Sequence, residues 1–182
     1  VLGYKEFKVN KNNYVFFAND KRLSADMALR ADDGMAVRVY TNDSTEALQD
    51  VTIGLARFDL QKVLAVVPYA PNISGILNGD FHYISQQEGD MSVSSSVSID
   101  KMTYEGCPIG NLSSEFVYMP KDNMREHYVD GTLSMDDYEV CSLTGLYDTD
   151  GEGTLDADLK MSRTPLLLLN GFVPDRIIGF KG

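Results

Sequence analysis

The chain has 182 residues and a net charge of −11, because 16 lysines and arginines stand against 27 aspartates and glutamates. This length supplies one domain with a core and is short for two. The negative charge opposes binding to nucleic acid. No apolar run in the sequence, 165–169 included, approaches the roughly 20 residues that a membrane-spanning helix needs.

Apolar and polar residues alternate through most of the chain, which predicts strands with one apolar and one polar face. Segments with this pattern, in chain order, are 25–29, 35–39, 51–55, 91–99, 112–118, 133–135 and 155–161. Turn residues separate them at spacings of about 8–12 residues, as in an antiparallel meander. We therefore predict an all-β fold, a long curled antiparallel sheet of repeated strand blocks that forms a groove. A sandwich and a barrel are the alternatives for the same pattern.

The stretch FDLQKVLAVVP interrupts the alternation. Its apolar residues at helical spacing are Leu60, Val63, Leu64 and Val67. Asp59 precedes them as a candidate N-cap and Pro68 follows as a stop. This pattern predicts a short amphipathic helix between two strands.

The closing stretch TPLLLLNGFVPDRIIGFKG resembles this interruption. Thr164 can cap a second short helix, with Pro165 at its first position and Gly171 just past its end. Pro71 and Pro174 lie about 100 residues apart and precede similar apolar and glycine patterns. We expect one all-β segment, 1–182, with repeat boundaries near 59–75 and 163–178. Since the sequence begins VLGYKEF, without an initiator methionine, we interpret it as a fragment of a longer protein.

The most site-like loop is DTDGEGTLDADL. Asp148, Asp150 and Glu152 occupy positions 1, 3 and 5 of a calcium-loop pattern, but Leu159 stands where the bidentate glutamate belongs. Strand-like alternation flanks the loop on both sides. We therefore predict a polar hairpin turn that uses glycines 151 and 153 for positive φ, with a weak surface calcium site as the alternative.

The residues give little support to catalysis. His82 and His127 lie in alternating segments without a nucleophile motif, and both are expected to face solvent. Cys107 and Cys141 lack metal-ligand spacing, and they can form a disulfide only if their strands are neighbours. We predict a protein that is not an enzyme, with no catalytic residues, no cofactor and no metal.

The apolar faces of the strands form the candidate site. Eight methionines contribute soft, flexible side chains to a surface that can hold acyl chains. The residues predicted to line this groove are Met91, Val93, Val97, Ile99, Leu155, Leu159, Met161, Leu166 and Leu167.

The segment LDADLKMSRTPLLLLNGFVPDRIIGFKG resembles a repeat boundary of the TamB-type translocation and assembly proteins of the bacterial envelope, from the Bacteroides side of that family. YEGCPIGNLSSEFVY and SLTGLYDTDGEGTLDADL resemble strand pairs of its repeats, and DLQKVLAVVPYAPNISGILNGDF resembles a preceding boundary. The resemblance covers most of residues 50–182.

This resemblance implies a periplasmic segment of a long protein anchored in the inner membrane. It implies a curled sheet with an apolar interior, related to AsmA-like and bridge-like lipid-transfer proteins, and a TamA-like barrel partner in the outer membrane. The expected role is outer-membrane protein assembly or phospholipid transport between membranes, with acyl chains or unfolded outer-membrane strands as cargo. The family implies no catalytic residues.

Two other classes fit parts of the pattern. An outer-membrane β-barrel also alternates, but tryptophan is absent and serines dominate one strand face. A β-sandwich adhesion or carbohydrate-binding module needs exposed aromatic residues. Its candidates are Tyr40, Tyr104, Tyr118 and Tyr138.

Overall fold

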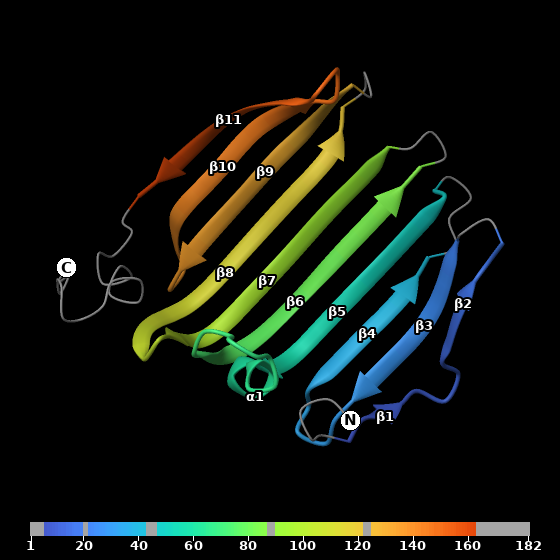
Figure 1. Cartoon of the computed structure of the whole chain (residues 1–182), viewed down its shortest axis with the longest axis vertical. Coiled ribbons are helices and arrows are strands. Elements are labelled where there is room, and N and C mark those ends of the chain that lie inside the picture. Colours follow the sequence, from blue (N-terminus) through green and yellow to red (C-terminus); the bar gives the residue numbers. More distant parts are fainter. Residues whose placement is uncertain (1–5, 20–21, 43–46, 87–89, 122–124, 163–182) are drawn as a thin grey trace.

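A computed structural model describes residues 6–19, 22–42, 47–86, 90–121 and 125–162. They form an 11-stranded sheet and one short helix (Figure 1). The elements are β1 (Lys8–Val9), β2 (Tyr14–Phe17), β3 (Leu23–Arg30), β4 (Ala36–Thr41), β5 (Gln49–Asp59), α1 (Leu60–Leu64), β6 (Ile73–Ser85), β7 (Met91–Tyr104), β8 (Cys107–Pro120), β9 (Glu126–Met135), β10 (Tyr138–Asp148) and β11 (Thr154–Met161).

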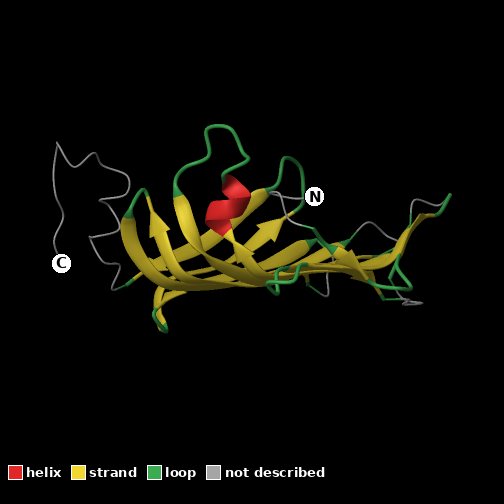
Figure 2. Ribbon diagram, turned by 90° about the horizontal axis from the view of Figure 1, so that it is seen from below, coloured by secondary structure: helices red, strands yellow, loops and turns green. Residues whose placement is uncertain are grey.

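The sheet is an antiparallel meander, as the alternating sequence predicts. From β3 to β11 each strand pairs with the next one along the chain, while β1 and β2 both pair with β3. Figure 2 shows that the sheet is open and bends only gently, toward the side on which α1 lies. The prediction of a strongly curled, groove-forming sheet is therefore wrong for the described residues. The alternation fixes which residues share a face, but it carries no information on how far the sheet bends.

The bend has a local origin in β-bulges, which accentuate strand twist and bending. Register shifts interrupt the pairing of β5 with β6, of β6 with β7 and of β7 with β8 near the end of the sheet that carries α1. The residues with positive φ at these irregularities are Arg57, Gly75, Lys101 and Gly110. Bulges in consecutive strands thus form a line across the sheet.

Side chains from neighbouring strands bind backbone groups that the bulges release. Asn78 Oδ1 accepts the N–H of Arg57 at 2.9 Å, and Asn111 Oδ1 accepts the N–H of Lys101 at 3.0 Å. Asp136 Oδ1 in turn accepts the N–H of Asn111 at 2.9 Å. These contacts replace ladder hydrogen bonds and hold the bulges in place.

We expect Asn111→Ala to lower the free energy of unfolding by about 1 kcal/mol, because the N–H of Lys101 loses its acceptor. Urea denaturation followed by circular dichroism measures this change. Asn13→Ala is the control, since the Asn13 side chain donates to the nearby Asn10 carbonyl in an exposed turn. Equal losses in the two variants would contradict the role of Asn111 in the bulge.

The predicted helix is present but shorter than the apolar pattern indicates. Asp59 caps α1 by accepting the N–H of Lys62 at 3.3 Å, as predicted. The helix ends at Leu64, and Val67, predicted to lie on its apolar face, is 49% exposed. A turn from Leu64 to Val67 replaces the last helical turn before Pro68. The second predicted helix, near 163–178, lies outside the described residues.

A single sheet leaves little interior. No large side chain in the described part of the chain is fully buried, and its buried apolar residues are Ala25, Ala28, Met35, Val51, Val129 and Val140. The chain exposes 12515 Å², whereas a compact protein of 20.2 kDa exposes roughly 8,800 Å². Much more surface therefore remains accessible than in a two-layered protein of this mass.

Candidate functional site

The strand register gives the sheet two chemically different faces. Directly paired residues point to the same side, so one face can be followed from strand to strand. On β7, Val93, Val97 and Ile99 point to one side, and Ser94, Ser96 and their even-numbered neighbours point to the other. We call the first side the apolar face and the second the polar face.

The apolar face is continuous across the meander. One row of directly paired residues crosses it from β3 to β11: Met27, Val39, Ile53, Phe81, Ser95, Phe116, Gly131, Leu143 and Leu159. A Cβ at Gly131 would lie 3.4 Å from the Phe116 ring, so the glycine leaves room for that ring. Ser95 is the single polar member of this row.

The structure brings most of the predicted groove-lining residues onto this face. On β7 this face contains Met91, Val93, Val97 and Ile99. The strand register from β7 to β11 places three more predicted residues on the same face: Leu155, Leu159 and Met161. Leu166 and Leu167 lie outside the described residues.

This face is accessible over both its middle and its β11 edge. In the middle, Ile53 is 39% exposed and Phe81 is 38% exposed. At the edge, exposure reaches 62% for Leu159 and 65% for Met161. No second sheet covers the apolar face among the described residues. The arrangement can therefore bury apolar cargo of extended shape.

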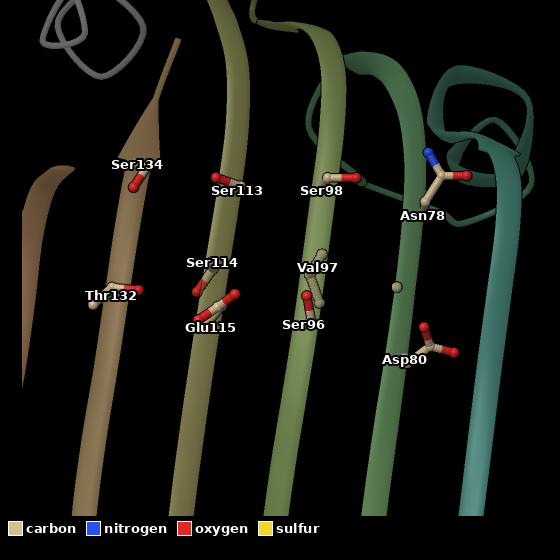
Figure 3. A pocket seen from close by; sticks show the side chains of 11 residues that line it. Asn78, Asp80, Ser96, Val97, Ser98, Ser113, Ser114, Glu115, Thr132 and Ser134 are labelled. Atoms are coloured by element: carbon tan, nitrogen blue, oxygen red, sulfur yellow. The ribbon is translucent and has the colours of Figure 1, made fainter. Parts of the chain in front are cut away.

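The polar face carries a shallow hollow of about 390 Å³ over β6 to β9 (Figure 3). Its labelled side chains come from paired positions, and nearly all are hydroxyls, amides or carboxylates. The hollow exists because the polar-face positions Ser96, Ser98 and Ser113 carry small side chains where larger ones would fill the surface. In this view the segment with α1 lies behind the sheet, so α1 and the apolar face are on the same side. The hollow does not suit apolar cargo.

His127 corrects the expectation that both histidines face solvent. It lies on β9 with 4% of its surface exposed, and its ring centroid is 4.9 Å from that of Tyr118. Its Nδ1 atom is buried and has no hydrogen-bond partner in the described part of the chain. The Tyr147 ring lies 6.5 Å beyond Tyr118, and burial raises the pKa of Tyr118. The rings of His127, Tyr118 and Tyr147 thus form an aromatic cluster at this end of the apolar face.

His82 is closer to the predicted solvent-facing position than His127 is. It is part of the polar face on β6, where its Nε2 atom lies 2.8 Å from Asp50 Oδ1, and its side chain is 36% exposed. No nucleophile accompanies this pair in the described contacts, and the contact is a hydrogen bond between two polar-face side chains.

The calcium-like loop is the hairpin turn between β10 and β11. Gly151 and Gly153 have φ of 64° and 78°, which confirms the predicted use of positive φ. The Arg125 guanidinium bonds Asp148 at 3.1 and 3.0 Å and lies 2.8 Å from Asp150 Oδ2. Arg125 therefore binds two of the carboxylates that the calcium pattern requires. The described residues contain no cluster of three or more potential metal ligands.

This ion pair has a measurable pH signature. The Arg125 hydrogen bonds hold the pKa of Asp148 below its ordinary value of 3.8, so the pair stabilises the fold above about pH 4. That stabilisation is lost as the pH falls through the lowered pKa. We expect Arg125→Gln to raise the pKa of Asp148 toward its ordinary value, as measured by carboxyl ¹³C NMR titration. An unchanged pKa would contradict the contact.

The two cysteines do not form the disulfide that the sequence left open. Cys107 lies on β8 and Cys141 on β10, with β9 between them. Because their strands are not neighbours, a bridge would require the sheet to rearrange.

The tyrosines proposed as a sugar platform do not share one face. Tyr40 belongs to the polar face, beneath the Arg38 guanidinium at 4.5 Å, whereas Tyr118 belongs to the apolar face. Tyr138 begins β10 directly after the turn from β9. They therefore do not form a flat aromatic surface on one side of the sheet.

The chain matches no protein-family model, no curated protein and no solved structure. In the part of the chain that the structure describes, no helix is long and apolar enough to cross a membrane.

Proposed function

We propose that this chain is a non-enzymatic segment of a bacterial envelope protein that carries apolar cargo on the apolar face of its sheet. The observation that carries the proposal is the row of apolar side chains from Met27 to Leu159, which crosses β3 to β11 and is accessible along its length. Acyl chains are the preferred cargo, and unfolded outer-membrane strands are the alternative.

The chemistry of the row favours acyl chains. Burial of apolar area contributes about 25 cal/mol per Å², and an acyl chain of a phospholipid can lie along several neighbouring strands. The flexible methionines and leucines of β7 and β11 can adapt to cargo without a fixed shape. Their polar counterparts, such as Ser96 and Asp158, lie on the opposite face and keep that face in water.

The resemblance of the segments around β8, β10 and β11 to TamB-type repeats supports the same proposal. In such a protein the segment would lie in the periplasm, between an inner-membrane anchor and a TamA-like outer-membrane barrel. It would guide phospholipid or outer-membrane strands along the sheet. No residue of the described chain is assigned a catalytic role.

Native mass spectrometry of the purified chain tests this function. After incubation with phosphatidylcholine vesicles and removal of the vesicles, we expect bound phospholipid on the protein. The same chain incubated with the soluble headgroup glycerophosphocholine is the control, because it has no acyl chains. Absence of bound lipid at every lipid concentration would contradict the acyl-chain proposal.

A further inference from the structure

The two edges of the sheet are built differently. At the N-terminal edge, β3 is covered by two short strands, β1 with 2 residues and β2 with 4 residues. At the other edge, β11 has 8 residues, contains no proline and pairs with β10 without a register shift. Within the described residues no strand pairs with the outer side of β11.

The backbone of β11 presents hydrogen-bonding groups along this outer side. The N–H of Ser162, directly after β11, donates to the Val140 carbonyl at 2.9 Å. In an antiparallel ladder, alternate residues direct both backbone groups to the same neighbour. Because Ser162 faces β10, the backbone groups of Ala157, Leu159 and Met161 face outward. A strand edge of this kind is a template for another strand.

The side chains of β11 select the partner. Leu159 and Met161 are 62% and 65% exposed on the apolar face, while Asp158 and Lys160 alternate with them on the polar face. All eight residues of the strand are exposed. A partner strand must therefore alternate in the same way and must place opposite charges across from Asp158 and Lys160.

We infer that a second copy of this chain pairs with β11 in antiparallel orientation, about a two-fold axis at Leu159. In this register Leu159 lies opposite Leu159 of the other copy, and Ala157 lies opposite Met161. Asp158 lies opposite Lys160, and the two-fold axis repeats this pair, so each dimer has two complementary charge pairs.

Charge disfavours the neighbouring registers that keep the apolar residues on one side, because each of them places like charges directly opposite each other. An axis at Asp158 would place Asp158 directly opposite its own copy at the centre of the pair, although Asp156 would then lie opposite Lys160, and an axis at Ala157 would place Asp156 opposite Asp158 twice. Like charges directly opposite each other destabilise a strand pair. In the favoured register the apolar faces of both copies lie on the same side, so the dimer extends that face. The dimer does not rest on the proposed lipid-carrying function.

Sedimentation equilibrium of the full chain, without lipid, tests the dimer. Asp158→Lys opposes lysine to lysine in the homodimer, and Lys160→Asp opposes aspartate to aspartate. We expect each substitution alone to raise the dimer Kd at least tenfold. An equimolar mixture of the two variants restores both charge pairs, and the double variant Asp158→Lys/Lys160→Asp restores them within one chain. Both are expected to dimerise as the unsubstituted chain does.

Three results would overturn the inference: an unsubstituted chain that is monomeric at 100 µM or above, a dimer that neither single substitution weakens, and a mixture that stays monomeric. Circular dichroism confirms that each variant is folded, and the exposed positions of both residues make this the expected result. Because no lipid is present, failure of the dimer is distinguishable from failure of lipid binding.

Discussion

Gly75→Ala is expected to lower the free energy of unfolding by about 2–4 kcal/mol, among the largest effects of any single substitution in this sheet. Gly75 forms the bulge in β6 with φ of 135°, a conformation that other residues rarely adopt. An added Cβ would lie 2.7 Å from Ile99 Cγ2 and 3.1 Å from the Asp100 carbonyl oxygen. Backbone strain and a clash with β7 therefore add together.

Gly106→Ala is the matched control for this substitution. Gly106 also has positive φ, at 78°, but no atom lies within 4 Å of an added Cβ. It should lose only about 1 kcal/mol, from backbone strain alone. Urea denaturation of both variants measures the difference. Equal losses would mean that β6 and β7 are not packed together at this bulge.

The double variant Phe81→Glu/Leu133→Glu is expected to weaken phospholipid binding at least tenfold. Phe81 on β6 and Leu133 on β9 are 38% and 36% exposed on the apolar face, so charges there can remain hydrated in the free protein. Bound acyl chains would remove that water, and an unpaired buried carboxylate is strongly unfavourable. Titration with a phosphatidylcholine that carries a fluorescent acyl chain measures the binding.

The control adds the same two charges to the opposite face. Ser113→Glu/Ser142→Glu places carboxylates on β8 and β10 of the polar face, and Lys160 lies directly across from Ser142. We expect this variant to bind the fluorescent lipid as tightly as the unsubstituted chain. Equal weakening in both double variants would point to net charge and would contradict binding on the apolar face.

Sequence alternation predicts the strands and their faces because the side-chain period of a strand is two residues. Thus Met91, Val93, Val97 and Ile99 fall on one face as predicted, and the meander order follows from the short turns between strands. Asp59 is recognisable as a cap because its side chain can reach the N–H three residues later. These features depend on neighbours in the sequence.

The features that the sequence does not reveal depend on neighbours in space. The bulges require that Asn78 and Asn111 reach the backbone of an adjacent strand, which no local pattern indicates. The pairing of Arg125 with Asp148 likewise joins residues 23 positions apart. The position of His127 on the apolar face could have been predicted from the sequence. His127 follows the same alternation as Val129 and Leu133, which lie on that face.

The most direct measurement of cargo binding is photo-crosslinking with benzoylphenylalanine at single positions. A probe that replaces Phe81, on the apolar face of β6, is expected to crosslink to phosphatidylcholine acyl chains taken up from vesicles. A probe that replaces Ser113, on the polar face of β8, should give no lipid adduct. Lipid adducts at Ser113 and none at Phe81 would contradict a cargo-carrying apolar face, as would the absence of adducts at both positions.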